Sequence, residues 1–187
     1  MDGRTNHAGI LRSSMAALVA MLRTDAVLIE NDVEVFYKLD HPSKRIEGGT
    51  KRFTMMIEPA GFSQTTGAGV LDLQYFTWII LKCKPNRLGH DEEDCLTYLC
   101  EYITDLLHKK MWGGMSTYVS RMLLLSKSCE IAANHRTVSV KLGDDEIGAL
   151  IWVWQSPKTI QQIESEGVEE YESATIVKIE NGAEGEI

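Results

Sequence analysis

The chain has 187 residues and a mass of 21.0 kDa, which suits one domain with a substantial core better than two domains. Hydrophobic residues make up 44% and charged residues 25%, and no apolar run is long enough for a membrane-spanning helix, so we expect a folded protein without a membrane segment. The formal charge of −8 argues against a tight grip on nucleic acid, because affinity for a phosphate backbone requires clustered Lys and Arg.

An amphipathic helix is predicted over residues 9–23. Its apolar side chains recur at helical spacing, at Leu11, Met15, Leu18 and Leu22. Two short strands are predicted next, over residues 33–39 and 52–58, because apolar and polar residues mostly alternate there. Pro59 is expected to end the second strand.

Small and polar residues dominate the stretch 61–69, which contains closely spaced glycines. These glycines do not match a phosphate-binding loop, because a strand rather than a helix follows them and no Lys does. We expect a hairpin loop that projects from the sheet and docks on an assembly partner. Its candidate docking residues are Gly61, Phe62, Gly67 and Gly69.

A long strand is predicted over residues 70–83, and the last strand of the core over residues 147–154. Both strands are apolar on both faces, so something must cover the second face of each. Exposed aromatic patches mark interfaces, and we therefore expect this face to contact a neighbouring subunit or another protein. The candidate interface residues are Phe76, Trp78, Ile80, Trp152 and Trp154. The alternative is that residues 115–135 cover them within the same chain.

A second amphipathic helix is predicted over residues 92–110. Acidic residues 91–94 lie at its start, and its end carries His108, Lys109 and Lys110. The helix dipole favours negative charge at the start of a helix and positive charge at its end. The glycines at 113 and 114 should stop it. Residues 118–129 fit a helix or a buried strand, and we favour the strand. A further strand is predicted over residues 137–142.

The composition changes after Pro157, where residues 158–187 hold eight glutamates and two lysines. We expect a domain over residues 1–157 and an acidic extension over 158–187 that is loose in isolation. Ile176, Val177 and Ile179 could add a strand to a partner. The predicted fold class is α+β: a mostly antiparallel sheet of about five strands, two helices on one face, and this extension.

Residues with catalytic or metal-binding chemistry show no recognisable pattern. The four cysteines form no CxxC pair, and the five histidines do not fall at the spacing of zinc ligands. No GxSxG motif surrounds a serine. We expect no catalytic, cofactor or metal site, although catalytic groups can be distant in sequence, so a small enzyme stays as the alternative of a different class.

The order of the predicted elements resembles that of the tail-terminator (tail completion) proteins of tailed bacteriophages, over residues 9–156. The likeness is carried by the opening helix 10–22, the strand that ends at Pro59, the long strand 73–83, the helix 92–110 and the closing strand 146–154. It is a likeness of pattern without a signature motif. The extension after Pro157 is longer than the pattern requires.

The resemblance implies a structural virion protein that closes the head-side end of a tail tube as a six-membered ring and joins it to the neck. Its implied partners are copies of itself, the tail tube protein, a neck or connector protein and the sheath protein of a contractile tail. DNA would pass through the ring without tight binding, and assembly would take place in the host cytoplasm. Another head–tail connector protein is the nearest alternative.

Overall fold

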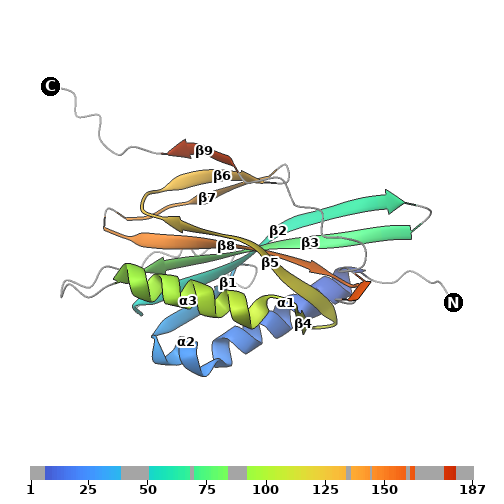
Figure 1. Ribbon diagram of the computed structural model, residues 1–187, viewed down its shortest axis with the longest axis horizontal. Coiled ribbons are helices and arrows are strands. Elements are labelled where there is room, and N and C mark those ends of the chain that lie inside the picture. The colour runs from blue at the N-terminus through green and yellow to red at the C-terminus, as the bar shows by residue number, and fades with distance from the viewer. Residues whose placement is uncertain are drawn as a thin grey trace.

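The computed structural model of the chain is an α+β structure in which a six-stranded sheet separates a helical layer from a smaller three-stranded sheet (Figure 1). The predicted class, a mostly antiparallel sheet with helices on one face, is confirmed, although the strands are more numerous than expected. The structure describes residues 7–38, 51–67, 70–83, 92–133, 136–143, 145–158, 161–162 and 175–179.

The helical layer contains α1 (His7–Thr24), the short α2 (Ala26–Glu30) and α3 (Glu92–Leu107). α2 was not predicted. It begins after Asp25, whose carboxylate accepts a hydrogen bond of 3.0 Å from the Leu28 N–H and so caps the helix. α3 ends earlier than predicted, because residues 108 and 109 form a turn and Lys110 already belongs to a strand.

The larger sheet has the strand order β1-β2-β3-β8-β5-β4. β1 runs parallel to β2, and every other pair in this sheet is antiparallel. The strand favoured for residues 118–129 is present as most of β5. The strands are β1 (Val33–Tyr37), β2 (Phe53–Gly67), β3 (Val70–Cys83), β4 (Lys110–Trp112), β5 (Met115–Leu125) and β8 (Ile147–Ser156).

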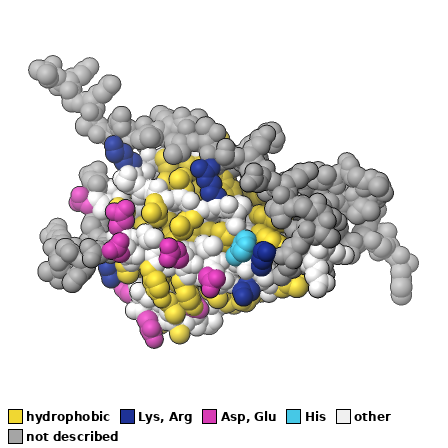
Figure 2. Space-filling model, in the orientation of Figure 1, with side chains coloured by type: hydrophobic (Ala, Val, Ile, Leu, Met, Phe, Trp, Pro, Cys, Tyr) yellow, Lys and Arg dark blue, Asp and Glu magenta, His cyan; other side chains and the backbone are white. Residues whose placement is uncertain are grey.

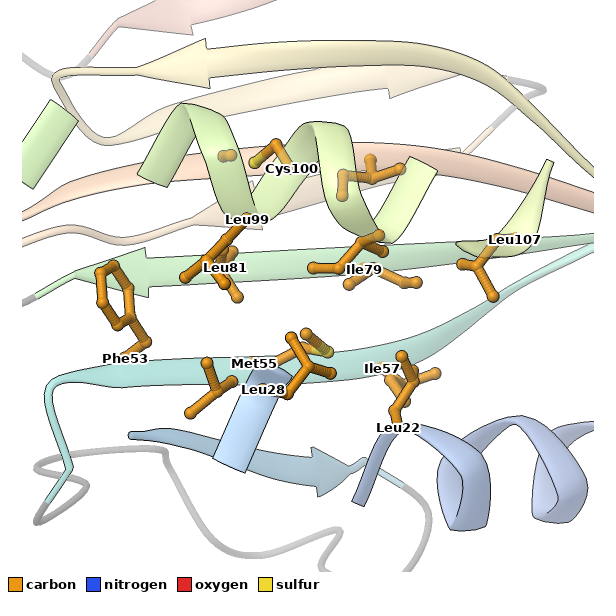
Figure 3. Close-up of a cluster of buried hydrophobic side chains, with 14 of the residues drawn as sticks. Leu22, Leu28, Phe53, Met55, Ile57, Ile79, Leu81, Leu99, Cys100 and Leu107 are labelled. Atoms are coloured by element: carbon orange, nitrogen blue, oxygen red, sulfur yellow. The ribbon is translucent and has the colours of Figure 1, made fainter. Parts of the chain in front are cut away.

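The main core fills the space between the helices and this sheet (Figure 3). The helices contribute the stripes that their periodicity predicts, with side chains 3 or 4 residues apart such as Leu18 and Leu22 in α1 and Leu99 and Ile103 in α3. The central strands contribute alternate residues, which point to one face of a sheet. These strand residues are Met55, Ile57, Ile79, Leu81, Ala149, Ile151 and Val153.

The second sheet contains β6 (Cys129–Ala133), β7 (Arg136–Val140) and β9 (Thr175–Ile179) in the order β7-β6-β9. It lies on the side of the large sheet opposite the helices (Figure 1). β9 comes from the acidic extension and pairs antiparallel with β6 of the same chain. The strand expected at Ile176, Val177 and Ile179 therefore forms within the chain, and this part of the extension belongs to the fold.

Candidate functional site

The five aromatic and apolar residues proposed for a subunit interface are buried within the chain. Phe76, Trp78, Ile80, Trp152 and Trp154 are all between 1% and 5% exposed. Ile131 of β6 and Val138 and Val140 of β7 pack in the same cluster and cover them. The structure thus corrects the expected interface, because the cover comes from within the chain. β6 lies in the 115–135 segment that the alternative named, whereas β7 follows that segment. Almost none of the surface of the five residues is left for a neighbouring subunit to bury.

Residues 61–67 of the glycine-rich stretch continue a long strand and do not form a loop, which is a second correction. β2 continues through Pro59 to Gly67, with a bulge between Pro59 and Gly61. Gly61 has a φ of 138°, a conformation that glycine adopts far more readily than other residues, and this allows the strand to continue beyond the bulge. Phe62 and Gly67 lie in β2, whereas Gly69 lies outside the described residues.

The far part of this hairpin extends beyond the rest of the sheet. β1 pairs with β2 only as far as Ile57, and β8 pairs with β3 only from Tyr75 onward. We call residues 61–67 and 70–74 the arm. Among the described strands, residues 61–67 pair only with β3 and residues 70–74 pair only with β2. Figure 1 shows the arm projecting past the ends of the neighbouring strands. The predicted projection is therefore present, as a two-stranded ribbon.

A buried polar cluster holds α1 to the sheet at the base of the arm. The Gln155 side-chain amide donates to the Ser14 hydroxyl at 2.9 Å and to the Thr117 hydroxyl at 3.1 Å. Ser14 in turn donates to the Trp112 carbonyl at 2.9 Å. Gln155 is the residue that pairs with Tyr75, which follows Gln74, the last arm residue of β3. These hydrogen bonds fix the helix, β5 and β8 where the arm leaves the sheet.

The outer edge of β5 is the second unusual surface. β4 pairs with β5 only over residues 115–117, and the Val119 N–H donates to His108 Nδ1 at 3.2 Å. Over residues 120–125, which we call the open edge, no strand in the described part of the chain pairs with the outer side of β5. Two apolar side chains here are exposed, Met122 by 36% and Leu124 by 42%. The open edge was not found from the sequence, because an open edge depends on which strands pair.

Charge is unevenly distributed over the helical face (Figure 2). α3 presents exposed acidic side chains along its length, at Glu93, Asp94, Glu101 and Asp105. Lys109 and Lys110 follow its C-terminus and are exposed, and Arg121 is exposed on the open edge. An acidic helix thus lies beside a basic strand region on the same molecule.

The described side chains include no group of metal ligands, and their buried Cys100 thiol is not reactive at neutral pH. Within the described ranges, no three His, Cys, Asp or Glu residues are grouped closely enough to hold a metal ion. All four cysteines are free thiols, and burial, with a smaller effect of Glu101, raises the pKa of Cys100 to about 12, so this thiol stays protonated at neutral pH. None of the helices in the described part of the chain is long and apolar enough to cross a membrane.

Comparison of the sequence with known protein families finds no matching family, and comparison with curated proteins finds no match either. The features of this chain that bear on its function are the arm, the open edge and the order of the elements.

Proposed function

We propose that this protein is a structural component of a tailed-bacteriophage virion. In this proposal, copies of the chain form a ring, of six subunits by the family resemblance, that closes the head-side end of the tail tube and joins it to the neck. The proposal is supported by the order of α1, β1, β2, β3 and α3, which follows the order that carried the resemblance. Its partners are copies of itself, the tail tube protein, a neck or connector protein and, in a contractile tail, the sheath protein.

The observation that carries the proposal is the arm. An isolated two-stranded hairpin is marginally stable in water, and a row of unpaired N–H and C=O groups is a template for another strand. The arm (residues 61–67 and 70–74) has such rows on both sides among the described strands. A surface of this kind suits strand addition to a protein partner, and an assembling structural protein has many such partners.

The charge of the chain fits a conduit that DNA crosses without binding. The formal net charge is −8, and the acidic side chains of α3 are exposed. An acidic surface repels the phosphate backbone, so a genome that is packaged or ejected through the ring finds no binding site on it. In this proposal the specific contacts of the protein are all made with other proteins.

The test is to add the purified, epitope-tagged protein to isolated tail tubes and to locate the tag by immunogold electron microscopy. The expected result is label at one end of each tube and none along its length. A variant in which a two-residue turn replaces residues 62–73 provides the control for the arm, provided that its circular dichroism spectrum shows a folded protein. Label along the whole tube, or binding only to head-side connectors, would contradict the terminator role.

A further inference from the structure

We propose that the arm of one subunit adds to the open edge of β5 in the next copy of the chain, so that the large sheet continues from subunit to subunit. This inference rests on the proposed function, a ring of identical copies, and specifies the contact that closes the ring. Its occupant is a second copy of this chain, and its chemistry is backbone hydrogen bonding between two strands.

The two surfaces lie on opposite sides of the same sheet. In the order β1-β2-β3-β8-β5-β4, the free side of the arm in β2 faces the β1 side, and the open edge faces the β4 side. They are too far apart in the sheet to pair within one subunit. Met122 is level with Ile57 across the sheet, through Ile151 and Ile79, so the arm of one copy meets the open edge of a like-facing copy when the two are displaced along the strand direction. Such a contact is heterologous, and it forms a ring when the rotation from copy to copy closes.

The strand directions suit this contact. β2 is antiparallel to β3, β3 to β8, and β8 to β5. β2 and β5 therefore run in opposite directions, and a second copy placed beside the first in the same orientation brings its β2 antiparallel to β5. Antiparallel pairing is the more stable of the two ladder types per residue.

The lengths and the neighbours of the two stretches also agree. The arm offers residues 61–67 of β2, and the open edge offers residues 120–125 of β5. β1 covers β2 only over 53–57, so in an antiparallel alignment β1 lies beyond the end of β5. β4 covers β5 only over 115–117, so it lies beyond the tip of the arm. Neither edge strand blocks the pairing.

The side chains of the open edge favour association, and the charges of the two stretches do not oppose it. Met122 and Leu124 expose apolar surface on a strand edge, where natural proteins usually place charges that prevent pairing. Arg121 is the single charged residue of residues 120–125, and Asp72 is the single charged residue of the arm strands. The two charges have opposite sign, so no like-charge repulsion opposes the contact.

Cross-linking between two variants tests the contact directly. One preparation carries Gln64→Cys, in the middle of the arm strand, and the other carries Met122→Cys, in the middle of the open edge. A short bismaleimide should join the two variants in the mixture into a cross-linked dimer and should give much less dimer in either preparation alone. A mixture of Gln64→Cys with Ile29→Cys, an exposed position on α2, is the matched control and should give no excess dimer. The same reaction with the unmodified protein measures any dimer that forms through the native Cys95, which is partly exposed.

A second pair of variants separates this inference from the proposed function. Met122→Lys combined with Leu124→Lys places charges on the open edge and should leave a folded chain that no longer assembles, whereas Ile29→Lys should assemble normally. Suppose that the protein forms rings, but that no cross-link forms between Gln64→Cys and Met122→Cys and that the double Lys variant still assembles. The arm contact is then wrong, and the proposed ring is unaffected. If the unmodified protein stays monomeric alone and with tail tubes, both proposals fail.

Discussion

Trp78 and Trp152 lie opposite each other on β3 and β8, with their ring centroids 5.9 Å apart and their ring planes at 78°. Such an edge-to-face pair contributes about 0.5–1.5 kcal/mol beyond the burial of its surface. Ile131 and Val138 of the second sheet belong to the same buried cluster. The two indoles are therefore the centre of a second core inside the subunit.

Replacing Trp152 with Ala should lower the free energy of unfolding by about 3–5 kcal/mol, because a large buried ring is lost and its cavity is not refilled. Chemical denaturation followed by circular dichroism measures this loss. Ile29→Ala is the control, since Ile29 is 54% exposed and its truncation should change stability by less than about 0.5 kcal/mol. A stable Trp152→Ala protein that had lost only its ability to assemble would restore the interface role that the burial of Trp152 excludes.

The turn between β4 and β5 gives a second stability prediction. Gly113 has a φ of 55°, and a Cβ added there would lie 2.4 Å from Ser14 Cα in α1. Gly114 has a φ of 81°, but a Cβ there would meet no atom within 4 Å. Gly114→Ala should therefore cost only the backbone strain of about 1–2 kcal/mol, and Gly113→Ala distinctly more. Thermal unfolding of both variants measures the two losses of stability. Equal melting temperatures would show that a Cβ at residue 113 does not clash with α1.

Local periodicity was enough to predict α1, α3 and β3, because each has a regular stripe of apolar residues at helical or strand spacing. α2 was missed since five residues show no periodicity. Pro59 does not end β2, although proline usually ends a strand. Here β1 stops opposite Ile57, so Pro59 stands at an edge position, where a missing N–H is tolerated.

The candidate site was predicted only in part. The apolar second faces of β3 and β8 correctly indicated cover, but a sequence pattern does not say whether the cover comes from the same chain. The cover is β6 and β7, short strands whose sheet is completed by β9 from the acidic extension. The projecting glycine-rich stretch was predicted, whereas the open edge of β5 was not, because it follows from the shortness of β4 and not from any residue of β5 itself.

Alkaline pH should weaken the contact between α3 and the start of α2. The Tyr102 hydroxyl donates to Asp25 Oδ2 at 2.8 Å, and this hydrogen bond, with burial and nearby charge as smaller causes, raises the pKa of Tyr102 to about 12 from 10.0. Because the folded-state pKa is the higher one, the stabilisation is complete below pH 10 and is lost as the pH rises toward 12.

The measurement is urea unfolding of the unmodified protein and of Tyr102→Phe across this pH range. The free energy of unfolding of the unmodified protein should fall more steeply above pH 10 than that of Tyr102→Phe. The difference between the two free energies should therefore become smaller. Cys100 titrates in the same range in both proteins and cancels in the comparison. Parallel curves would mean that the Tyr102 hydrogen bond contributes no stability.

The conduit proposal predicts that the protein does not bind duplex DNA at physiological salt. Non-specific DNA-binding proteins show dissociation constants of roughly 10⁻⁴ to 10⁻⁶ M under these conditions, through Lys and Arg contacts to phosphates. A fluorescence anisotropy titration with a short labelled duplex should show no binding in this range. Micromolar binding that weakens with added salt would replace the passive conduit with a nucleic-acid-binding function.

We expect copies of the chain to assemble into a closed ring. Native mass spectrometry of the purified protein, alone and after incubation with tail tubes, measures this assembly. The expected result is one discrete multimer of the 21.0 kDa chain, a hexamer by the family resemblance, in at least one of the two conditions. A monomer of 21.0 kDa in both conditions, from a protein shown to be folded, would contradict it.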